Sequence, residues 1–388
     1  MSIRAEKQRL RSAGSKSVVM TTRYPLDHPG GVESVARALA DSLSKSGESW
    51  KVSHVAAYPG RVGFARLPLI GDLVAGGRLA AQVMGKGDVL LVHGAEYAWG
   101  PMVVGRLTGR PIVTVWHGVR GNEVIPPTQR RIGKVARGFF LWSQGLLQGA
   151  ALRADATVAV SPAVAAQVQS RYGFRGQIML IPNGVTIESG RRHDDERISA
   201  ASNGGPLRAI WVGTSAYQKG LDRAVGACEL ARARGQDVSL TVVGIPVESA
   251  GLELASGGSW LTALGAVPPS EMEALYRRHD ILLFPTRYEA FGLVALEAMA
   301  AGLPVIGSSV VRSLIEGAGE VVVGDDAEAY AEALRALADP ERRRLLGRVA
   351  MERARAFSWE TSTASYLEVL NVVARDRGHQ HRHQGRRM

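Results

Sequence analysis

The chain has 388 residues, of which 46 % are hydrophobic, and carries a formal net charge of +11. This length and apolar content predict a globular protein with two domains of ordinary size, and exclude a disordered chain. No stretch approaches 18 uninterrupted apolar residues and the charged N-terminus lacks an apolar segment, so a membrane span and secretion through a signal peptide are both disfavoured. The single cysteine, Cys228, excludes an intrachain disulfide and fits a reducing, cytoplasmic setting.

Short apolar runs alternate with helical patterns along the chain, which predicts βαβ units and parallel sheets. The expected strands of the first half are 17–21, 51–55, 88–92, 111–116, 156–160 and 177–181. Those of the second half are 207–212, 238–243, 281–284, 304–306 and 320–323. Helices with recognisable ends lie between them. Ser161 and Pro162 begin one that Gly173 ends, and Ser270 with Glu273 predicts a capping box before another.

A polar segment, 186–206, separates the two series of strands, and its charge, serine and glycine without apolar period predict an interdomain linker. We therefore expect two Rossmann-like α/β domains with mainly parallel sheets that face each other across a cleft. The expected divisions are a basic tail (1–16), the first domain (17–186), the linker (187–206), the second domain (207–358), a helix that packs back on the first domain (359–373) and a disordered basic tail (374–388).

The positive charge allows nucleic acid, anionic lipid or phosphorylated small molecules as partners. One basic block, Arg130, Arg131, Lys134 and Arg137, precedes the apolar run 139–142 that ends in Trp142. This block fits either a helix on an anionic membrane surface or a solvated helix face. Elsewhere few aromatic residues are interleaved with basic ones, so no nucleic-acid partner is expected.

Two glutamates, Glu289 and Glu297, lie eight positions apart in the strand–loop–helix segment 280–306. The helix 293–301 ends at Gly302, and Glu297 is its only polar residue. A helix that is apolar all round is buried, so we expect the Glu297 carboxylate inside the core, where it needs a partner. Either the diol of a ligand or a structural arginine would serve.

Several fingerprints of nucleotide and metal chemistry are absent from the sequence, among them the P-loop, the dinucleotide-binding G-x-G-x-x-G and a D-x-D triplet. A nucleotide-using enzyme without them must neutralise phosphate with helix amides and basic side chains. Gly30 and Gly31 before a helix, Lys219 after strand 207–212, and the helix end at Gly292 could do so. The glycine pair also fits an ordinary tight turn, and Lys219 a surface lysine.

These residues resemble the retaining glycosyltransferases of family 4, which have the GT-B fold. The matching segments of the second half are IPNGV (181–185), WVGTSAYQKGLDRAV (211–225), LTVVG (240–244), the long segment 264–306 and FSWE (357–360). In the first half, HPGGVESVARALADSL (28–43) and VTVWHG (113–118) match more loosely. The E-x7-E segment with its flanking FGL and EAMA-x-G-x-PVI is the most specific part of a resemblance that spans residues 17–372.

The resemblance implies a role for each matched position. Glu289 would contact hydroxyls of the donor sugar, Glu297 would bind the ribose hydroxyls of the nucleotide, and Lys219 would neutralise the diphosphate. The residues expected to bind the donor are Gly30, Gly31, Gly213, Thr214, Lys219, Glu289, Phe291, Gly292, Leu293, Val294 and Glu297. Those expected to act in catalysis are Glu289, His117, which would lie by the donor sugar, and Lys219.

The resemblance also implies the chemistry. A hexose-type sugar would pass from a UDP- or GDP-sugar with retention, by front-face displacement that needs neither a metal nor another cofactor and stabilises the leaving diphosphate electrostatically. The acceptor would be a glycan, a lipid-linked molecule or a small molecule, as in the biosynthesis of cell-envelope polysaccharides. The expected location is the cytoplasm, with peripheral contact to the inner face of an anionic plasma membrane as a further hypothesis.

The sequence departs from the family pattern at one position. Family members commonly have an arginine where this chain has Thr214, and a neutral hydroxyl cannot replace a guanidinium fork. Either Lys219 neutralises the diphosphate alone or another arginine substitutes. The departure motivates the main alternative, a GT-B protein that binds nucleotide sugar or glycan without turnover. A GT-B epimerase or phosphorylase, and a nucleic-acid-binding protein, are the remaining alternatives.

Overall fold

The computed structural model describes residues 16–28, 30–48, 50–59, 68–119, 134–187, 205–245 and 259–384, with the backbone alone at 68–69, 134–141 and 377–384. These residues divide into two compact units. The first unit is made of the described residues up to Gly184 together with those from Trp359 onward, and the second is made of Val185–Ser358.

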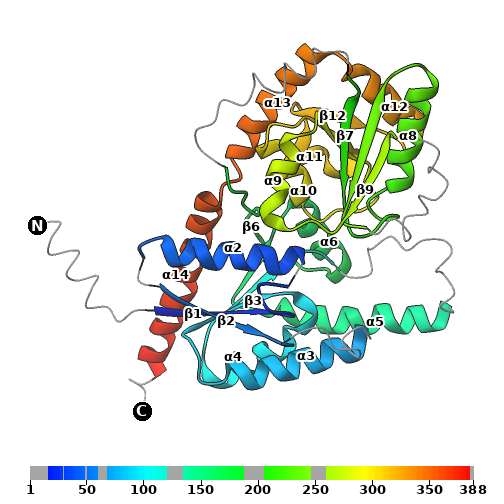
Figure 1. The fold of residues 1–388 in the computed structure, drawn as a ribbon. Helices are drawn as coiled ribbons and strands as arrows, with labels where there is room; N and C mark the ends of the chain where they lie inside the picture. Colours follow the sequence, from blue (N-terminus) through cyan, green and yellow to red (C-terminus); the bar gives the residue numbers. More distant parts are fainter. Residues whose placement is uncertain are drawn as a thin grey trace, which may run out of the picture. The chain divides into compact units, whose positions relative to one another are not determined.

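The first unit is built on a six-stranded sheet in which every strand pair is parallel, in the order β2-β1-β3-β4-β5-β6. Its strands are β1 (Lys16–Thr22), β2 (Trp50–Ala56), β3 (Val89–His93), β4 (Ile112–Trp116), β5 (Ala156–Ala159) and β6 (Met179–Leu180). Its helices are α2 (Gly31–Lys45), α3 (Pro68–Val83), η2 (Ala95–Tyr97), α4 (Trp99–Thr108), α5 (Lys134–Ala151), α6 (Pro162–Tyr172) and α14 (Trp359–Gln384). Figure 1 shows α2 on one side of this sheet and α3 and α4 on the other. Both faces are thus covered, which explains why every residue of β3 and β4 is buried.

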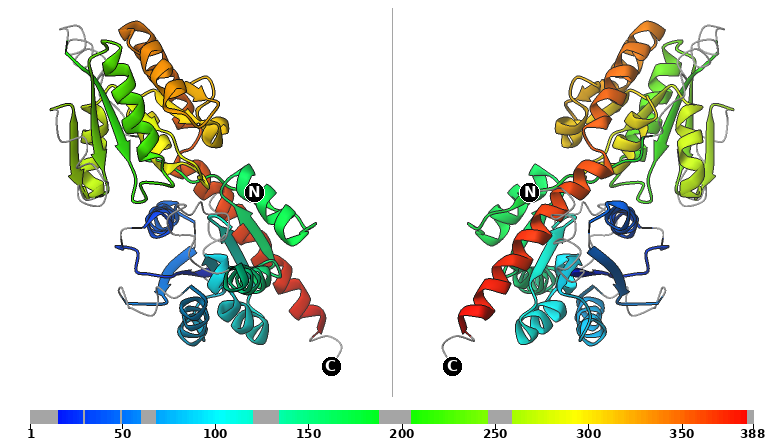
Figure 2. Two further views of the ribbon diagram at one scale, coloured as in Figure 1. Left: turned by 90° about the vertical axis from the view of Figure 1, so that its right-hand side faces the viewer. Right: turned by 90° about the vertical axis from the view of Figure 1, so that its left-hand side faces the viewer.

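The helix α14 packs against α2, where the hydroxyl of Thr363 donates to that of Ser42 at 2.7 Å. Its buried residues Tyr366, Leu370 and Val373 recur at helical spacing and form one stripe. Figure 2 shows α14, in red, as a single long helix. It runs to Gln384, through residues for which the sequence predicts a disordered tail. Once tertiary packing has formed the first turns, each further residue adds a hydrogen bond at little cost, so the helix continues beyond its packed part.

The second unit has its own six-stranded parallel sheet, in the order β12-β11-β10-β7-β8-β9. Its strands are β7 (Leu207–Val212), β8 (Val238–Val243), β9 (Leu261–Gly265), β10 (Ile281–Phe284), β11 (Val305–Ser308) and β12 (Gly319–Val322). Its helices are α8 (Leu221–Ala233), α9 (Pro269–Arg277), α10 (Leu293–Ala300), η6 (Ser309–Val311), α11 (Arg312–Ile315), α12 (Ala327–Ala336) and α13 (Pro340–Arg355). The α/β class and the two parallel sheets predicted from the sequence are confirmed.

The core of the second unit lies on both faces of its sheet. Side chains alternate along β10, so that Leu282 and Phe284 pack with α10 and α13 while Ile281 and Leu283 pack with α8 and α12. Figure 1 shows α8 and α12 on one side of the sheet and α9, α10 and α13 on the other. Helices on both faces pack against these strands. The ends of β7 and β10, from which the two loops begin, are therefore fixed in position.

Helix ends were predicted well where a side chain or a glycine sets them. Ser161 accepts the amide of Val164 at 3.2 Å as the N-cap of α6, and Gly173 and Gly302 follow their helices in the left-handed conformation. The predicted capping box before α9 is wrong, because the helix begins at Pro269 behind the N-cap Pro268, without a side-chain cap. A proline at the first helical position is already set for the helix and moves its start forward.

One further difference from the predicted elements is local. The strand β9 was not predicted, because it lies at the sheet edge and its half-exposed sequence gives a weak apolar signal. The exposed acidic pair at 325–326 also makes structural contacts: Asp326 caps α12, and Asp325 pairs with Arg223 at 2.6 Å. No helix within the described ranges is long and apolar enough to cross a membrane.

Candidate functional site

The strand order of the second sheet places two of the predicted residues at one edge. The sheet is wound in one direction through β7, β8 and β9 and in the other through β10, β11 and β12, so it switches direction between β7 and β10. Ligands of such sheets bind beyond the carboxyl ends of the strands at this switch point. Lys219 lies in the loop that follows β7, and Glu289 lies in the loop that follows β10.

Lys219 and Glu289 form an ion pair across these loops, with Lys219 Nζ donating to Glu289 Oε2. Their side chains are 18 % and 14 % exposed, so the pair is mostly screened from water yet reachable. Lys219 packs so closely on Gly213 that a Cβ added there would lie 2.8 Å from its Cγ. Its Nζ lies 5.5 Å from the ring centroid of Phe284. The structure thus joins two residues that lie 70 positions apart in the sequence.

The two loops touch through a glycine. Gly220 follows Lys219 with φ +71°, and a Cβ at this position would overlap the carbonyl oxygen of Pro285. Only glycine combines this backbone conformation with so close an approach. The position of Lys219 is therefore set by the backbone of the neighbouring loop.

The N-terminus of α10 provides amide groups at the same edge of the sheet. Gly292 is the N-cap, with φ +99°, and no acidic residue lies in the first turn. The amides that begin a helix have no acceptor within it and carry a partial positive charge. Phe291, just before the cap, packs edge-on against Phe357 with ring centroids 6.1 Å apart. This helix end is a second candidate anion site at the edge that carries Lys219.

The prediction that Glu297 is buried in the core is wrong. Its side chain is exposed, and it lies on the stripe of α10 that also contains the half-buried Leu293, Val294 and Ala300. The buried Tyr276 donates its hydroxyl to Glu297 Oε2 at 3.0 Å. Surrounding protein atoms desolvate the carboxyl and raise its pKa, and the Tyr276 hydrogen bond offsets part of this effect. The prediction failed because an apolar composition does not show which face of a short helix remains exposed to solvent.

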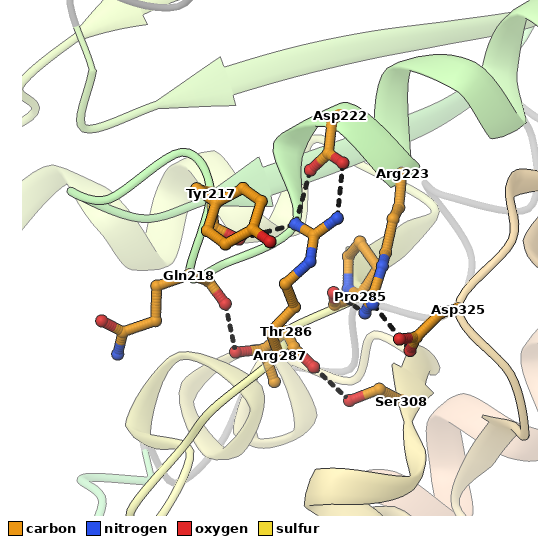
Figure 3. A network of polar contacts seen from close by, with 9 residues as sticks. All are labelled: Tyr217, Gln218, Asp222, Arg223, Pro285, Thr286, Arg287, Ser308 and Asp325. Carbon is orange, nitrogen blue, oxygen red and sulfur yellow. Dashed lines mark hydrogen bonds and ion pairs between the residues drawn. The ribbon is translucent and has the colours of Figure 1, made fainter. Parts of the chain in front are cut away.

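Thr214 is exposed, and neither nearby arginine stands in for the missing guanidinium as a free group. Arg287 pairs with Asp222 at 2.5 Å, and the buried Arg223 pairs with Asp325 at 2.6 Å. Figure 3 shows both guanidinium groups turned toward these carboxylates. Lys219 is thus the cation that the described part of this edge places next to Glu289.

In the first unit, His117 follows β4 and lies against His93, the last residue of β3. His93 Nδ1 and His117 Nε2 are 2.9 Å apart, and the rings stack with centroids 5.2 Å apart. His93 is fully buried, and its Nε2 has no hydrogen-bond partner among the described residues. One ring of the pair donates to the other, and the tautomers of the two rings set the direction.

Burial keeps both histidines neutral near pH 7. Desolvation lowers the pKa of His117 to about 4, although Glu96 nearby acts in the opposite direction. Desolvation, followed by the neighbouring His117 and His54, lowers the pKa of His93 well below its usual value. The pair therefore acts through hydrogen bonding and shape at neutral pH, without adding positive charge.

The start of α2 differs from a simple anion site. Gly30 is its N-cap and Gly31 its first residue, so the helix begins earlier than the sequence predicts, which places both glycines before it; Pro29 lies outside the described residues. The carboxyl of Glu33 is buried at this helix end, so close to Gly30 that a Cβ there would overlap Oε2. Desolvation raises the pKa of Glu33. Sequence reasoning missed this side chain, although an acid three residues after a candidate N-cap is its signal.

The part of the chain that the structure describes contains no group of three or more histidine, cysteine and acidic residues that could hold a metal ion. Of the basic block, Arg130 and Arg131 lie outside the described residues, and only the backbone is described at Lys134 and Arg137.

The chain matches known families and structures along most of its length. Residues 8–189 match the model of "Glycosyltransferase Family 4", and residues 206–339 match that of "Glycosyl transferases group 1". A D-inositol 3-phosphate glycosyltransferase from an Arthrobacter species is 27 % identical over 90 % of this chain and 93 % of its own length. The enzyme of the same name from Geodermatophilus obscurus is 32 % identical, but that match covers only 58 % of this chain and 54 % of the relative.

Two solved structures share the fold. Sucrose-phosphate synthase from Thermosynechococcus elongatus superimposes with a TM-score of 0.75 at 21 % identity, over 92 % of this chain and 99 % of that one. WaaG, a glycosyltransferase involved in lipopolysaccharide biosynthesis, superimposes with a TM-score of 0.69 at 17 % identity, over 91 % and 99 %. The sheets, the switch-point edge and these likenesses define a glycosyltransferase with the GT-B fold. The chain belongs to glycosyltransferase family 4.

The lowered histidine pKa values predict how stability depends on pH. The unfolded chain takes up protons near pH 6.5 that the folded His117 takes up only near pH 4. The stabilisation by the neutral pair is therefore complete above pH 6.5 and is lost as the pH falls toward 4. We expect the midpoint of thermal unfolding to fall over this window by several degrees more in the wild type than in a His93→Gln/His117→Gln variant. Equal slopes for both proteins would contradict this account.

Proposed function

We propose that this glycosyltransferase moves a hexose-type sugar from a nucleotide-diphosphate sugar to its acceptor with retention and without a metal. The Lys219–Glu289 pair, held at the switch point of the second sheet beside the start of α10, carries the proposal. It combines one cation, a set of helix amides and a carboxylate acceptor at one edge. A sugar diphosphate presents the complementary groups, two phosphates followed by a ring of hydroxyls.

The charge on the diphosphate is assigned to Lys219 and to the amides of Leu293 and Val294. Negative charge on the leaving diphosphate grows as the sugar–oxygen bond breaks. A cation and amides that are already in place stabilise it more in the transition state than in the bound donor. Lys219 is one charge where an arginine and a lysine together would supply two. The helix amides therefore contribute a larger share of the diphosphate stabilisation here than they would in a protein with arginine at position 214.

The hydroxyl groups of the donor are assigned to the two glutamates. An ionised carboxylate accepts two hydroxyl hydrogen bonds at once, so either glutamate fits a vicinal diol. Glu289, next to Lys219, is assigned to the sugar. Glu297, four residues into α10 and supported by the Tyr276 hydroxyl, is assigned to the ribose. Neighbouring protein atoms already remove part of the water around the Glu297 carboxylate. A bound diol would displace the remaining water and supply hydrogen bonds in its place.

The nucleotide and the acceptor are supported by the relatives alone. Anabaena HepE, solved with UDP and glucose, shares the fold with a TM-score of 0.68 at 15 % identity. UDP and GDP are accordingly the first donors to test. The relatives named D-inositol 3-phosphate glycosyltransferase make a phosphorylated inositol the first small-molecule acceptor to test, beside glycans and lipid-linked acceptors. The roles of His117 at the donor sugar and of Gly30 and Gly31 at the diphosphate stay predictions.

Thr214 favours a second candidate, a family member that binds nucleotide sugar without turning it over. Both candidates bind the nucleotide, so binding alone does not separate them. Turnover does. A protein that binds the nucleotide diphosphate with ordinary affinity, yet releases no sugar product with any acceptor of the three classes, would be the non-catalytic form.

The first prediction concerns Glu289. With the donor selected by a thermal-shift comparison of UDP, GDP and ADP, Glu289→Gln should lower kcat by about 10²- to 10³-fold, as the loss of one preorganised charged contact does. Affinity for the nucleotide diphosphate should change far less, because the contact is with the sugar. Turnover should persist in EDTA. Unchanged kcat in the variant would remove Glu289 from the site, and EDTA sensitivity would disprove metal independence.

The second prediction concerns Glu297. Glu297→Gln should weaken nucleotide binding by about 10- to 100-fold, since hydrogen bonds to a charged group contribute about 1.5–3 kcal/mol. The 2′-deoxy nucleotide should lose affinity for the wild type but little more for the variant. Tyr276→Phe, which keeps the carboxylate but removes its support, is the matched control and should lose less. If calorimetry showed that removal of the 2′-hydroxyl costs the wild type and Glu297→Gln the same affinity, Glu297 would not bind the ribose.

Peripheral membrane contact is supported by an exposed apolar patch on the first unit, made of Ile70 and Leu73 on α3 and of Trp142 and Leu146 on α5. The patch borders a groove lined in part by Trp99 and Arg153. We expect sedimentation with anionic vesicles at low salt, and its loss in Trp142→Ser/Leu146→Ser. Sedimentation that is the same for neutral and anionic vesicles, or that the variant retains, would disprove contact through this patch.

A further inference from the structure

The loops that carry Lys219 and Glu289 are joined by a network of polar contacts, which Figure 3 shows from close by. Two of its members are close to these residues in the sequence: Gln218 directly precedes Lys219, and Arg287 lies two positions before Glu289. The backbone carbonyl of Gln218 accepts the amide of Arg287 at 2.8 Å and lies 3.2 Å from the hydroxyl oxygen of Thr286, whose single proton is shared with the carbonyl of Tyr288. These two contacts fix the residue before Lys219 against the loop that leads to Glu289.

The guanidinium of Arg287 closes the network. Its Nη1 donates to Asp222 Oδ1 and to the carbonyl of Tyr217, both at 2.7 Å, and its Nη2 donates to Asp222 Oδ2 at 2.5 Å. The guanidinium carbon also lies 4.2 Å from the centroid of the Tyr217 ring. One side chain from the loop after β10 thus holds the loop after β7 and the first turn of α8 together.

The carbonyl groups of the second loop are also occupied. Pro285 accepts Arg223 Nη1 at 3.3 Å, Thr286 accepts the hydroxyl of Ser308 at 2.7 Å, and Tyr288 accepts the hydroxyl of Thr286 at 2.9 Å. Three occupied carbonyl groups within four residues leave the loop few alternative conformations. The loop after β7 is held internally, by hydrogen bonds such as that from Trp211 Nε1 to the carbonyl of Lys219 at 3.1 Å, and the Arg287 side chain ties it to the loop that carries Glu289.

The geometry calls for arginine at position 287. A guanidinium can give two parallel hydrogen bonds to a carboxylate and a third to a carbonyl while it stacks on a ring, whereas an ammonium group cannot. Asp222 is 57 % exposed and Arg287 is 15 % exposed, so water screens the charge attraction and the pair adds little as a charge pair alone. What the arrangement provides is a fixed geometry.

We propose that Arg287, together with Asp222, is a positioning residue that sets the place of Lys219 relative to Glu289. The inference rests on the function proposed above, in which these two side chains meet the diphosphate and the donor sugar. Without the guanidinium the loop after β7 keeps its backbone contacts at Gln218 and Gly220 but loses the three hydrogen bonds at Tyr217 and Asp222. The loop can then shift, and a displacement of about 1 Å of a group that stabilises the transition state costs up to 10²-fold in rate. Contacts made by Glu297 on α10 are outside the network and stay in place.

The test compares Arg287→Met, Arg287→Lys and Asp222→Asn with the control Arg234→Met, which removes the exposed Arg234–Glu328 pair of the same unit. With the UDP- or GDP-sugar that the wild type uses, Arg287→Met should lower kcat about 10- to 100-fold. Arg287→Lys should recover only part of this loss. The advantage of nucleoside diphosphate over nucleoside monophosphate in calorimetry should shrink, while affinity for the monophosphate stays within about twofold. Arg234→Met should change neither.

The double variant Arg287→Met/Asp222→Asn should be no slower than Arg287→Met, since the two side chains act as one unit. A melting temperature that falls with kcat unchanged, or a control that loses as much activity as Arg287→Met, would overturn the proposal. Hydrogen exchange without ligand tests it independently of turnover. In Arg287→Met, the amides of 215–220 should exchange faster than in Arg234→Met. Equal exchange in the two variants would overturn the positioning role. If the amides exchange faster in Arg287→Met but the wild-type protein transfers no sugar, only the proposed function would be contradicted.

Discussion

The ion pair between Lys219 and Glu289 exists because β7 and β10 are neighbours at the point where the second sheet changes direction. Helices packed on both faces of the sheet hold these two strands in place. Each partner then leaves its strand within a few residues, and the close contact of Gly220 with the backbone at Pro285 brings the loops together. The place of the N-terminus of α10 follows from the same strand, because the helix starts where the second loop ends.

Rigidity at this edge comes from many modest contacts. The ion pairs here are partly exposed, and exposed pairs stabilise a fold little. Their value lies in direction: bidentate and shared hydrogen bonds admit one geometry of the loops and exclude others. In the first unit the same result is reached without charge. The buried His93 and the half-buried His117 hold one another by a single hydrogen bond, and desolvation keeps both neutral.

Much of the fold could be predicted from the sequence, because strands buried on both faces and capped helices leave local patterns. The strand β9 escaped because an edge strand is half exposed and its pattern is weak. Glu297 was expected in the core because composition counts apolar residues without saying which stripe of α10 packs on the sheet. Arg287 and Tyr276 were not singled out, since an arginine in a loop and a tyrosine on a helix are common on any surface. Their partners Asp222 and Glu297 lie 65 and 21 positions away.

The sequence by itself determined the class of domain, the positions of most strands, and the motif residues with their family. Those properties are encoded in short windows, through periodicity, caps and characteristic spacing. Tertiary structure decided which of these residues meet: Lys219 with Glu289, Arg287 with Asp222, and the exposed Glu297 with the hydroxyl of Tyr276. Strand order and helix orientation result from packing over the whole unit, and no short window contains that information.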